Sequence, residues 1–172
     1  VPAAGLQPPG DRCAVARSEA GLGDGPVPLA AQAGELGLRR AQNRHGGAAG
    51  QCLIRQQAAD FGVEELIDLQ PEEGGQHLCL RVRKTGENTE HVARLLAQAA
   101  GIRPQQVGYA GRKDRHAVTT QWFSLHLPGR PDPAGFALPP AVEILEMCRR
   151  RRKLVVGGLR GNRFRLLVRE FA

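Results

Sequence analysis

The sequence predicts an α+β domain in which strands outnumber helices. Several short runs alternate apolar and polar residues, and this period of two is typical of strands that bury one face. Only one run, residues 89–100, repeats apolar residues at helical spacing. Clusters of glycine and proline separate these runs and favour turns. Because 172 residues are enough to bury a core, we predict a sheet with a single helix packed on it.

The alternating runs predict seven strands. Residues 77–84 show the pattern most clearly, because Leu78 and Val82 share one side of the strand while Arg81 and Arg83 share the other. This strand is therefore expected to be half-buried, with a basic outer face. The predicted strands, in chain order, are residues 52–55, 60–67, 77–84, 107–109, 120–127, 142–147 and 163–169.

The predicted helix has recognisable ends. Asn88 or Thr89 is expected to cap its first turn, since both side chains can accept a hydrogen bond from a backbone N–H. Val92 and Leu96 lie on its apolar stripe, and Gly101 is expected to end it.

Residues 1–48 are expected to form a flexible lead-in. They are rich in glycine, proline and alanine and poor in large apolar residues, so they have little surface to bury. A short helix near residues 29–40 is the one regular element that we consider there, because alanine and leucine dominate. The ordered domain is expected to cover residues 49–172.

Both ends of the sequence are unusual for a complete protein. The chain begins with Val1, and its only methionine is Met147. It stops at Ala172, directly after a strand-like run. We therefore expect this chain to be a fragment of a longer protein.

The charge balance favours a polyanionic partner. The formal net charge is +7 and the isoelectric point is about 10.0. Nucleic acid is the first candidate for such a partner. A basic surface with no specific partner is the alternative, and net charge does not separate the two.

Cysteine and histidine spacing gives no indication of a metal site. The four cysteines form no C-x-x-C pair, and the five histidines form no H-E-x-x-H pattern. We interpret Cys52, Cys79 and Cys148 as small apolar residues in a protein of the reducing cytoplasm. No apolar run is long enough to cross a membrane, and the first residues do not read as a signal peptide.

One loop is the strongest candidate for chemistry. Asp114 lies between Lys113 and Arg115, within a glycine-containing segment that leads into a predicted strand. Nearby positive charge favours the ionised form of a carboxylate, and loops carry function when a rigid scaffold positions them. On charge pattern alone, a solvated Lys-Asp-Arg turn is the competing interpretation.

The residues around Asp114 resemble the signature of the TruD family of tRNA pseudouridine synthases, in which the aspartate is catalytic. The matching string is Ala-Gly-x-Lys-Asp-x-x-Ala-Val-Thr-x-Gln at residues 110–121. Three further motifs match the family in order: Arg55 with Asp60-Phe61-x-Val63-x-Glu65, Gly74-Gly-Gln-His77 with Val82-x-Lys84 and Asn88-Thr89, and Arg152-Lys-Leu154 with Gly158-x-x-Gly-Asn-x-Phe164. Gly62 departs from the pattern, because a larger residue is usual between Phe61 and Val63.

The resemblance implies a function and a set of site residues. The implied activity is isomerisation of the uridine at position 13, in the D-arm of tRNA, with Asp114 as the nucleophile. Phe61 and Asn162 map to substrate-binding positions, with Phe164 close by. The remaining matches are the signature residues Lys113, Thr119 and Gln121, and the basic residue Arg55, of which we expect Lys113, Gln121 and Arg55 to bind substrate.

The resemblance also implies a fold. The pseudouridine-synthase core is a mixed, mainly antiparallel sheet flanked by helices, and residues 49–172 match its N-terminal part. Family members continue with an inserted domain and a second half of the sheet, so we expect weak or no turnover from this chain alone. We expect a monomer.

The implied reaction needs no metal and no redox cofactor, because the uracil is detached, rotated and rejoined without loss of any group. The carboxylate can attack the ribose, attack the uracil or remove a ribose proton, and the sequence leaves these routes open. The target base must also leave its stack, which favours an aromatic platform and an amide such as Asn162.

A basic run, Arg149, Arg150, Arg151, Arg152 and Lys153, suits an RNA phosphate backbone. A solvated hairpin tip is the competing interpretation. Arginines that alternate on the strands, Arg81, Arg83, Arg163 and Arg165, can extend the same positive face. Two further hypotheses therefore stand beside the enzyme: a non-catalytic fragment that binds tRNA, and a non-functional product of a broken gene.

Overall fold

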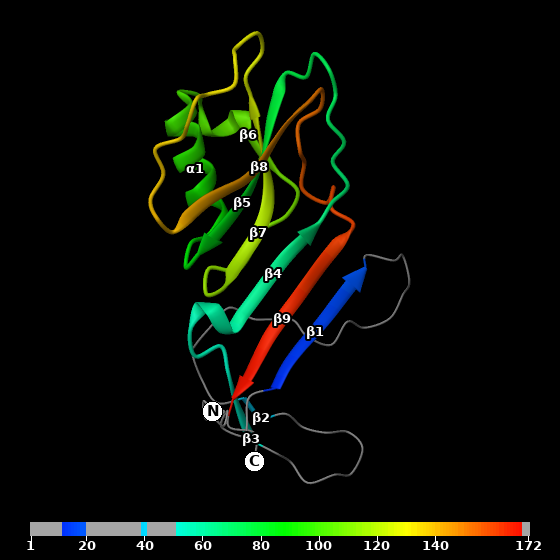
Figure 1. The fold of residues 1–172 in the computed structure, drawn as a ribbon, viewed down its shortest axis with the longest axis vertical. Helices are drawn as coiled ribbons and strands as arrows, with labels where there is room; N and C mark the ends of the chain where they lie inside the picture. Colours follow the sequence, from blue (N-terminus) through cyan, green and yellow to red (C-terminus); the bar gives the residue numbers. More distant parts are fainter. Residues whose placement is uncertain (1–11, 20–38, 41–50, 170–172) are drawn as a thin grey trace, which may run out of the picture.

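A mixed β-sheet organises the part of the chain that the structure, a computed structural model, describes: residues 12–19, 39–40 and 51–169. The strand order is β2-β3-β9-β4-β7-β5-β8, with β1 also paired to β9 and β6 to β7 (Figure 1). The strands are β1 (Arg12–Glu19), β2 (Arg39–Arg40), β3 (Gln51–Ile54), β4 (Phe61–Leu66), β5 (His77–Thr85), β6 (Val107–Tyr109), β7 (Val118–His126), β8 (Val142–Arg150) and β9 (Gly161–Arg169).

Strand direction confirms the mixed, mainly antiparallel sheet. β4 and β7 are parallel, and the other described pairs are antiparallel. A parallel pair needs a crossover rather than a tight turn, and here the chain between β4 and β7 forms β5, helix α1 and β6. The strands predicted from alternation are all present, although β8 extends three residues beyond its predicted end.

The helix α1 (Thr89–Ala100) has the ends that the sequence predicts. The Asn88 side chain accepts a hydrogen bond from the backbone N–H of His91, and Gly101 ends the helix in the left-handed conformation with φ 63°. Its inner side buries Val92 and Leu96 completely. Burial of each such side chain contributes about 1.5–3 kcal/mol, so this helix holds one half of the sheet firmly. Two 3-10 turns, η1 (Ala58–Asp60) and η2 (Pro104–Gln106), precede β4 and β6.

Strand alternation gives the sheet two faces. The face that α1 covers, called the front face here, carries Leu80 and Val82 of β5 and Phe123 of β7. Residues of opposite parity, such as Arg81 and Thr120, point to the back face. Helix α1 lies beside β5 and β6, whereas β4, β9 and β1 extend away from it (Figure 1). The front face of β4 and β9 is therefore not covered by this helix.

The N-terminal segment differs from its prediction where the structure describes it. β1 lies within the expected flexible lead-in and pairs with β9 from Gly161 to Val168, one residue short of the end of that strand. The prediction was wrong for this stretch because an edge of β9 offers free backbone groups for a ladder, which composition does not reveal. Arg39–Arg40 form a strand instead of the end of a helix; the rest of the predicted helix at 29–40 lies outside the described residues.

Among the described residues, no helix is both long enough and apolar enough to span a bilayer. Cys79 is fully buried and Cys148 half-buried, both as free thiols. This agrees with their interpretation as small apolar residues, and burial raises the pKa of the Cys79 thiol to about 12.

Candidate active site

Asp114 lies on the loop between β6 and β7, where the helix-covered part of the front face ends. The loop is anchored by the buried residues Ala110 and Ala117, while the Asp114 side chain remains 39% exposed. A half-exposed carboxylate on an anchored loop is accessible to a ligand and fixed in position, which is the arrangement expected of a reactive group.

The direct charge partner of Asp114 is Arg55. Its Nη2 donates a hydrogen bond to Asp114 Oδ2 at 3.0 Å. Arg55 has φ 57°, the left-handed region that side-chain-bearing residues rarely adopt. Such a conformation costs about 1–3 kcal/mol and persists only where the surroundings enforce it. Here it directs the guanidinium from the end of β3 toward the Asp114 loop.

A buried carboxylate, Asp60, enforces this turn. Its Oδ2 accepts hydrogen bonds from the backbone N–H groups of Gln56 and Gln57, at 2.9 and 3.2 Å. Its Oδ1 accepts one from Arg169 Nη2 at 2.8 Å. The hydrogen bond from Arg169 is the main reason that the pKa of Asp60 lies below its ordinary value, in spite of burial. Asp60 thus ties the Arg55 turn to the end of β9.

The two cations beside Asp114 in the sequence, Lys113 and Arg115, bond to other groups instead. Lys113 turns into the protein, where its Nζ lies 3.0 Å from Oε1 of the buried Glu65. The Arg115 Nε donates to the carbonyl of Gly86. Successive side chains on a loop diverge, so sequence neighbours of a carboxylate are not its contacts by default.

A second cation near Asp114 comes from Lys84 on β5. This side chain is fully buried, and its Nζ donates to the backbone carbonyls of Glu87 and Asp114. Burial lowers the pKa of Lys84 from 10.5 to about 8; the charge of Asp114 opposes this shift and that of Lys113 adds to it. Lys84 was missed as a site residue. Its position in the alternation, in phase with Leu80 and Val82, was the available signal.

Gln121, on β7, links the Asp114 loop to helix α1 by hydrogen bonds. It is fully buried: Oε1 accepts from the Thr89 hydroxyl at 2.9 Å, and Nε2 donates to the Gly111 carbonyl at 3.0 Å. The Thr89 hydroxyl in turn accepts from the Lys113 backbone N–H. Gln121 and Lys113 were predicted to bind substrate; because their side chains are buried and paired, we now place them beneath the site, where they fix the loop to α1 and β7.

Phe61 and Phe164 form an aromatic platform next to Arg55. Their rings lie parallel, with centroids 6.0 Å apart and an interplanar angle of 5°. The guanidinium carbon of Arg55 lies 4.3 Å from the centroid of the Phe61 ring. Both side chains are partly exposed, so the front face of β4 and β9 presents an aromatic surface close to Asp114.

Asn162 lies on the same face. It is paired in register with Glu65, as Phe164 is with Val63, so alternation points all four side chains to the front. Within the described part of the chain, its Oδ1 is buried and accepts no hydrogen bond. A buried acceptor without a donor is costly, and a ligand that donates a hydrogen bond there relieves that cost.

The basic run lies apart from this group, at the end of β8 and in the loop that follows. Most of its side chains donate to the protein itself. Arg149 alone bonds to Asp132 and to the carbonyls of Leu127 and Arg130, at 2.7–3.0 Å. Arg150 contacts Glu72, Arg151 the carbonyl of Glu73, and Lys153 the carbonyl of Gln105, whereas Arg152 is exposed. The structure therefore favours a folded hairpin end over a continuous phosphate-binding surface.

The described residues contain no group of three or more histidine, cysteine, aspartate or glutamate side chains suited to hold a metal ion. The site consists of one accessible carboxylate, one paired guanidinium, an aromatic pair and an amide with an unused acceptor.

Comparisons with known proteins match most of the described chain. A family model described as tRNA pseudouridine synthase D (TruD) matches residues 43–172. The chain is similar to a tRNA pseudouridine synthase D of Methylococcus capsulatus, with 49% identity over 126 residues, and to one of Aeromonas salmonicida, with 48% identity over 129 residues. These matches cover 73% and 74% of this chain but 36% and 37% of the relatives, so the chain spans about a third of their length.

A solved structure agrees with these matches. It comes from Methanosarcina mazei and is described as a TruD-type tRNA pseudouridine synthase D. It superimposes with a TM-score of 0.62 and 30% sequence identity. The alignment covers 69% of this chain and 27% of that one.

Proposed function

Because the chain belongs to the TruD family of tRNA pseudouridine synthases, we propose that it supplies the catalytic aspartate and part of the base-binding surface for converting uridine to pseudouridine in tRNA. The observation that carries this proposal is the contact between Arg55 and Asp114 beside the Phe61–Phe164 pair. These residues come from three separate segments, and they meet on the part of the sheet that the helix leaves open.

The reaction is an isomerisation. The bond between ribose C1′ and uracil N1 breaks, the base rotates, and a bond between C1′ and C5 forms; N1 gains a proton and C5 loses one. In our proposal Asp114 is the nucleophile. Its Oδ2 is held by Arg55, while its Oδ1 accepts no hydrogen bond from the described residues and is free to attack. Attack on the ribose, attack on the uracil and removal of a ribose proton all require this one carboxylate.

The front face has the groups needed to hold an everted base. Extrusion of a nucleotide costs a few kcal/mol and is offset by stacking and hydrogen bonding in the protein. The Phe61–Phe164 pair provides an apolar aromatic surface, and Asn162 Oδ1 is a free acceptor for the uracil N3–H. The uridine at position 13 in the D-arm is the target that the family resemblance favours.

A chimera provides the test, because this chain spans about a third of its relatives. The matched segment of the Methylococcus relative is replaced by the matched segment of this chain, and pseudouridine in tRNA is measured. We expect activity in the chimera and a loss on the order of 10³-fold or more for Asp114→Asn, the scale seen when a reacting nucleophile is removed. Binding of tRNA should be kept.

The matched control is Asp68→Asn, which makes the same chemical change at an exposed carboxylate and should leave turnover unchanged. If Asp114→Asn retains normal turnover, Asp114 is not the nucleophile. If the chimera folds and binds tRNA but forms no pseudouridine at all, the non-catalytic binding fragment is the better description. Sequencing the modified tRNA tests the position-13 assignment separately.

A further inference from the structure

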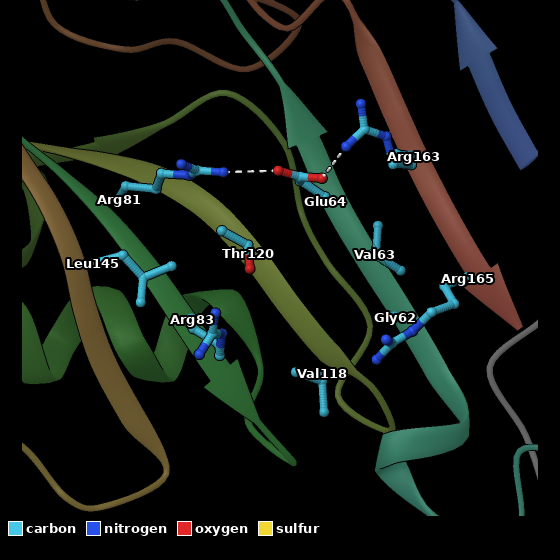
Figure 2. A pocket seen from close by; sticks show the side chains of 10 residues that line it. All are labelled: Gly62, Val63, Glu64, Arg81, Arg83, Val118, Thr120, Leu145, Arg163 and Arg165. Atoms are coloured by element: carbon cyan, nitrogen blue, oxygen red, sulfur yellow. Dashed lines mark hydrogen bonds and ion pairs between the residues drawn. The ribbon is translucent and has the colours of Figure 1, made fainter. Parts of the chain in front are cut away.

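A pocket of about 330 Å³ opens on the back face of the sheet, on the side opposite the Asp114 platform. We call it the back-face pocket. It lies across β9, β4, β7, β5 and β8, and most of the side chains that line it have back-face parity (Figure 2). Its lining consists of Gly62, Val63, Glu64, Arg81, Arg83, Val118, Thr120, Leu145, Arg163 and Arg165. None of the residues proposed for the uridine site lines it.

The pocket concentrates positive charge, with four guanidinium groups against one carboxylate in its lining. Glu64 lies between two of the arginines: Oε1 accepts from Arg81 at 2.7 Å and Oε2 from Arg163 at 2.8 Å (Figure 2). Each guanidinium has five N–H donors, so neither is used up by these bonds. Arg81 also lies 3.4 Å from the exposed Glu146, a partly screened pair. Glu64 therefore fixes two arginines in place, and Arg163 keeps most of its charge for a ligand.

The other two arginines are less constrained. Arg83 contacts Glu143 at 3.1 Å, but both side chains are at least half exposed, and such surface pairs contribute little. Arg165 is exposed and makes no hydrogen bond or ion pair with the other described residues. Both guanidinium groups are therefore available to an anionic ligand that enters the pocket.

Gly62 gives Arg165 its position. A Cβ at Gly62 would lie 3.4 Å from the Arg165 Cβ and 3.5 Å from its Nε, so the arginine lies against the bare backbone of β4. A larger side chain would occupy that side of the pocket and displace the guanidinium. The departure from the family pattern at Gly62 thus falls within the lining of this pocket.

We propose that the back-face pocket binds a backbone phosphate of RNA, separately from the uridine site. Guanidinium groups match phosphate oxygens in planar, two-pronged hydrogen bonds, and the Thr120 hydroxyl on the pocket floor adds a donor. The apolar side chains of Val118 and Leu145 suit an adjoining ribose. A free nucleotide carries the same phosphate, but no aromatic side chain lines the pocket to stack its base. The excess of positive charge in the chain also favours a polyanion.

The first arm of the test uses the 172-residue chain and inorganic phosphate. Backbone and arginine Nε–H signals are followed by ¹H–¹⁵N NMR during titration with phosphate, against chloride at the same ionic strength. We expect shifts at Gly62, Thr120, Arg163 and Arg165. Arg165→Gln should weaken phosphate binding at least about tenfold, the scale of one hydrogen bond between charged groups.

Two further variants separate a built pocket from general electrostatics. Gly62→Val fills the pocket and removes no charge, and valine suits an extended strand position; it should weaken phosphate binding as much as Arg165→Gln does. Arg94→Gln removes one exposed charge from α1 and should leave the binding unchanged. Equal weakening by all three variants, or shifts spread over the whole surface, would overturn the proposal.

The second arm uses tRNA. Affinity is measured at several salt concentrations for the same variants. Arg165→Gln should weaken binding and reduce the slope of log K against log salt by about one, while Gly62→Val weakens binding at low salt. If phosphate binds but neither Arg165→Gln nor Gly62→Val changes the affinity for tRNA, the RNA assignment is wrong and the ligand is a free phosphate compound. Asp68→Asn, an exposed carboxylate outside both sites, should leave both arms unchanged. Neither arm measures pseudouridine formation, so failure here is distinct from failure of the uridine site.

Discussion

Two carboxylates on the front face, Glu65 and Asp114, are held in opposite ways. Glu65 is fully buried and has both oxygens occupied, by Lys113 Nζ at 3.0 Å and the Trp122 backbone N–H at 2.9 Å. Asp114 is 39% exposed and has one oxygen bonded to Arg55. Glu65 is closed off from solvent and has a donor on each oxygen, so a ligand cannot reach it, whereas Asp114 is accessible and keeps one oxygen without a described donor. Exposure to solvent and an unused acceptor oxygen separate a reactive carboxylate from a structural one. The presence of a nearby cation does not, because both carboxylates have one.

The largest expected difference between the two regions is in stability. Glu65→Gln leaves the Lys113 ammonium buried without a counter-charge, so we expect a loss of about 3–5 kcal/mol in the free energy of unfolding. Asp114→Asn should cost less than about 1 kcal/mol, because its ion pair is partly exposed. Urea unfolding of both variants measures this.

The control for this comparison is the double variant Glu65→Gln with Lys113→Met, which removes the orphaned charge and should recover most of the lost stability. The contrast breaks if Glu65→Gln and Asp114→Asn destabilise the chain equally, or if the double variant is no more stable than Glu65→Gln alone.

Asp60 extends the comparison to a third carboxylate. It is buried and saturated like Glu65, and we expect Asp60→Asn to cost about 2–3 kcal/mol at neutral pH, because charged hydrogen bonds to Arg169 and to the Arg55 turn are lost. The pKa of Asp60 is lowered from 3.8 in the folded protein. Its contribution is therefore fully present above pH 3.8 and is lost as the pH falls below that value.

The corresponding measurement is urea unfolding of wild type and Asp60→Asn at a series of pH values from neutral to acid. The difference in stability between the two proteins should shrink once the pH passes below 3.8. A difference that stays constant across the series would show that the charge of Asp60 contributes nothing.

A smaller effect than at Asp60 is expected at Lys84, which donates to carbonyls rather than to a carboxylate. Lys84→Met removes two hydrogen bonds but also a buried charge, so the net cost at pH 7 is about 1 kcal/mol. The folded-state pKa is lowered to about 8, and the unfolded chain keeps the proton up to about 10.4. The contribution of Lys84 to stability therefore rises with pH between these values.

This sign is checked by unfolding wild type and Lys84→Met at pH 7, 8 and 9.5. The advantage of the wild-type protein should grow toward pH 9.5. An advantage that falls with pH would contradict this prediction and would mean that the charge of Asp114 outweighs the burial of Lys84.

The sequence predicted the local features of this fold well. Asn88 and Gly101 bound the helix as their chemistry requires, and alternation located the strands. It also placed Phe61 and Phe164 at positions that the sheet brings together. The helix ends depend on residues within a few positions of one another. The face to which a strand residue points depends only on alternation along its own strand.

The choice of partner between distant residues was not predictable in the same way. Lys113 and Arg55 are both cations near the signature, yet only Arg55, 59 residues from Asp114, reaches it. The sequence of the basic run 149–153 predicts a phosphate-binding surface, but the Arg149 side chain donates its hydrogen bonds to nearby carbonyls. Long side chains bond to whichever acceptor the tertiary fold delivers, and that depends on strand order.

Strand β9 has a consequence for how the polypeptide is made. It is the last described strand in chain order, yet it lies between β4 on one side and β1 on the other. On the ribosome, β1, β3 and β4 emerge long before their common neighbour and wait with bare edges. Such distant pairings slow folding and expose nascent chains to aggregation, so the yield of folded sheet should fall when synthesis outpaces the arrival of β9.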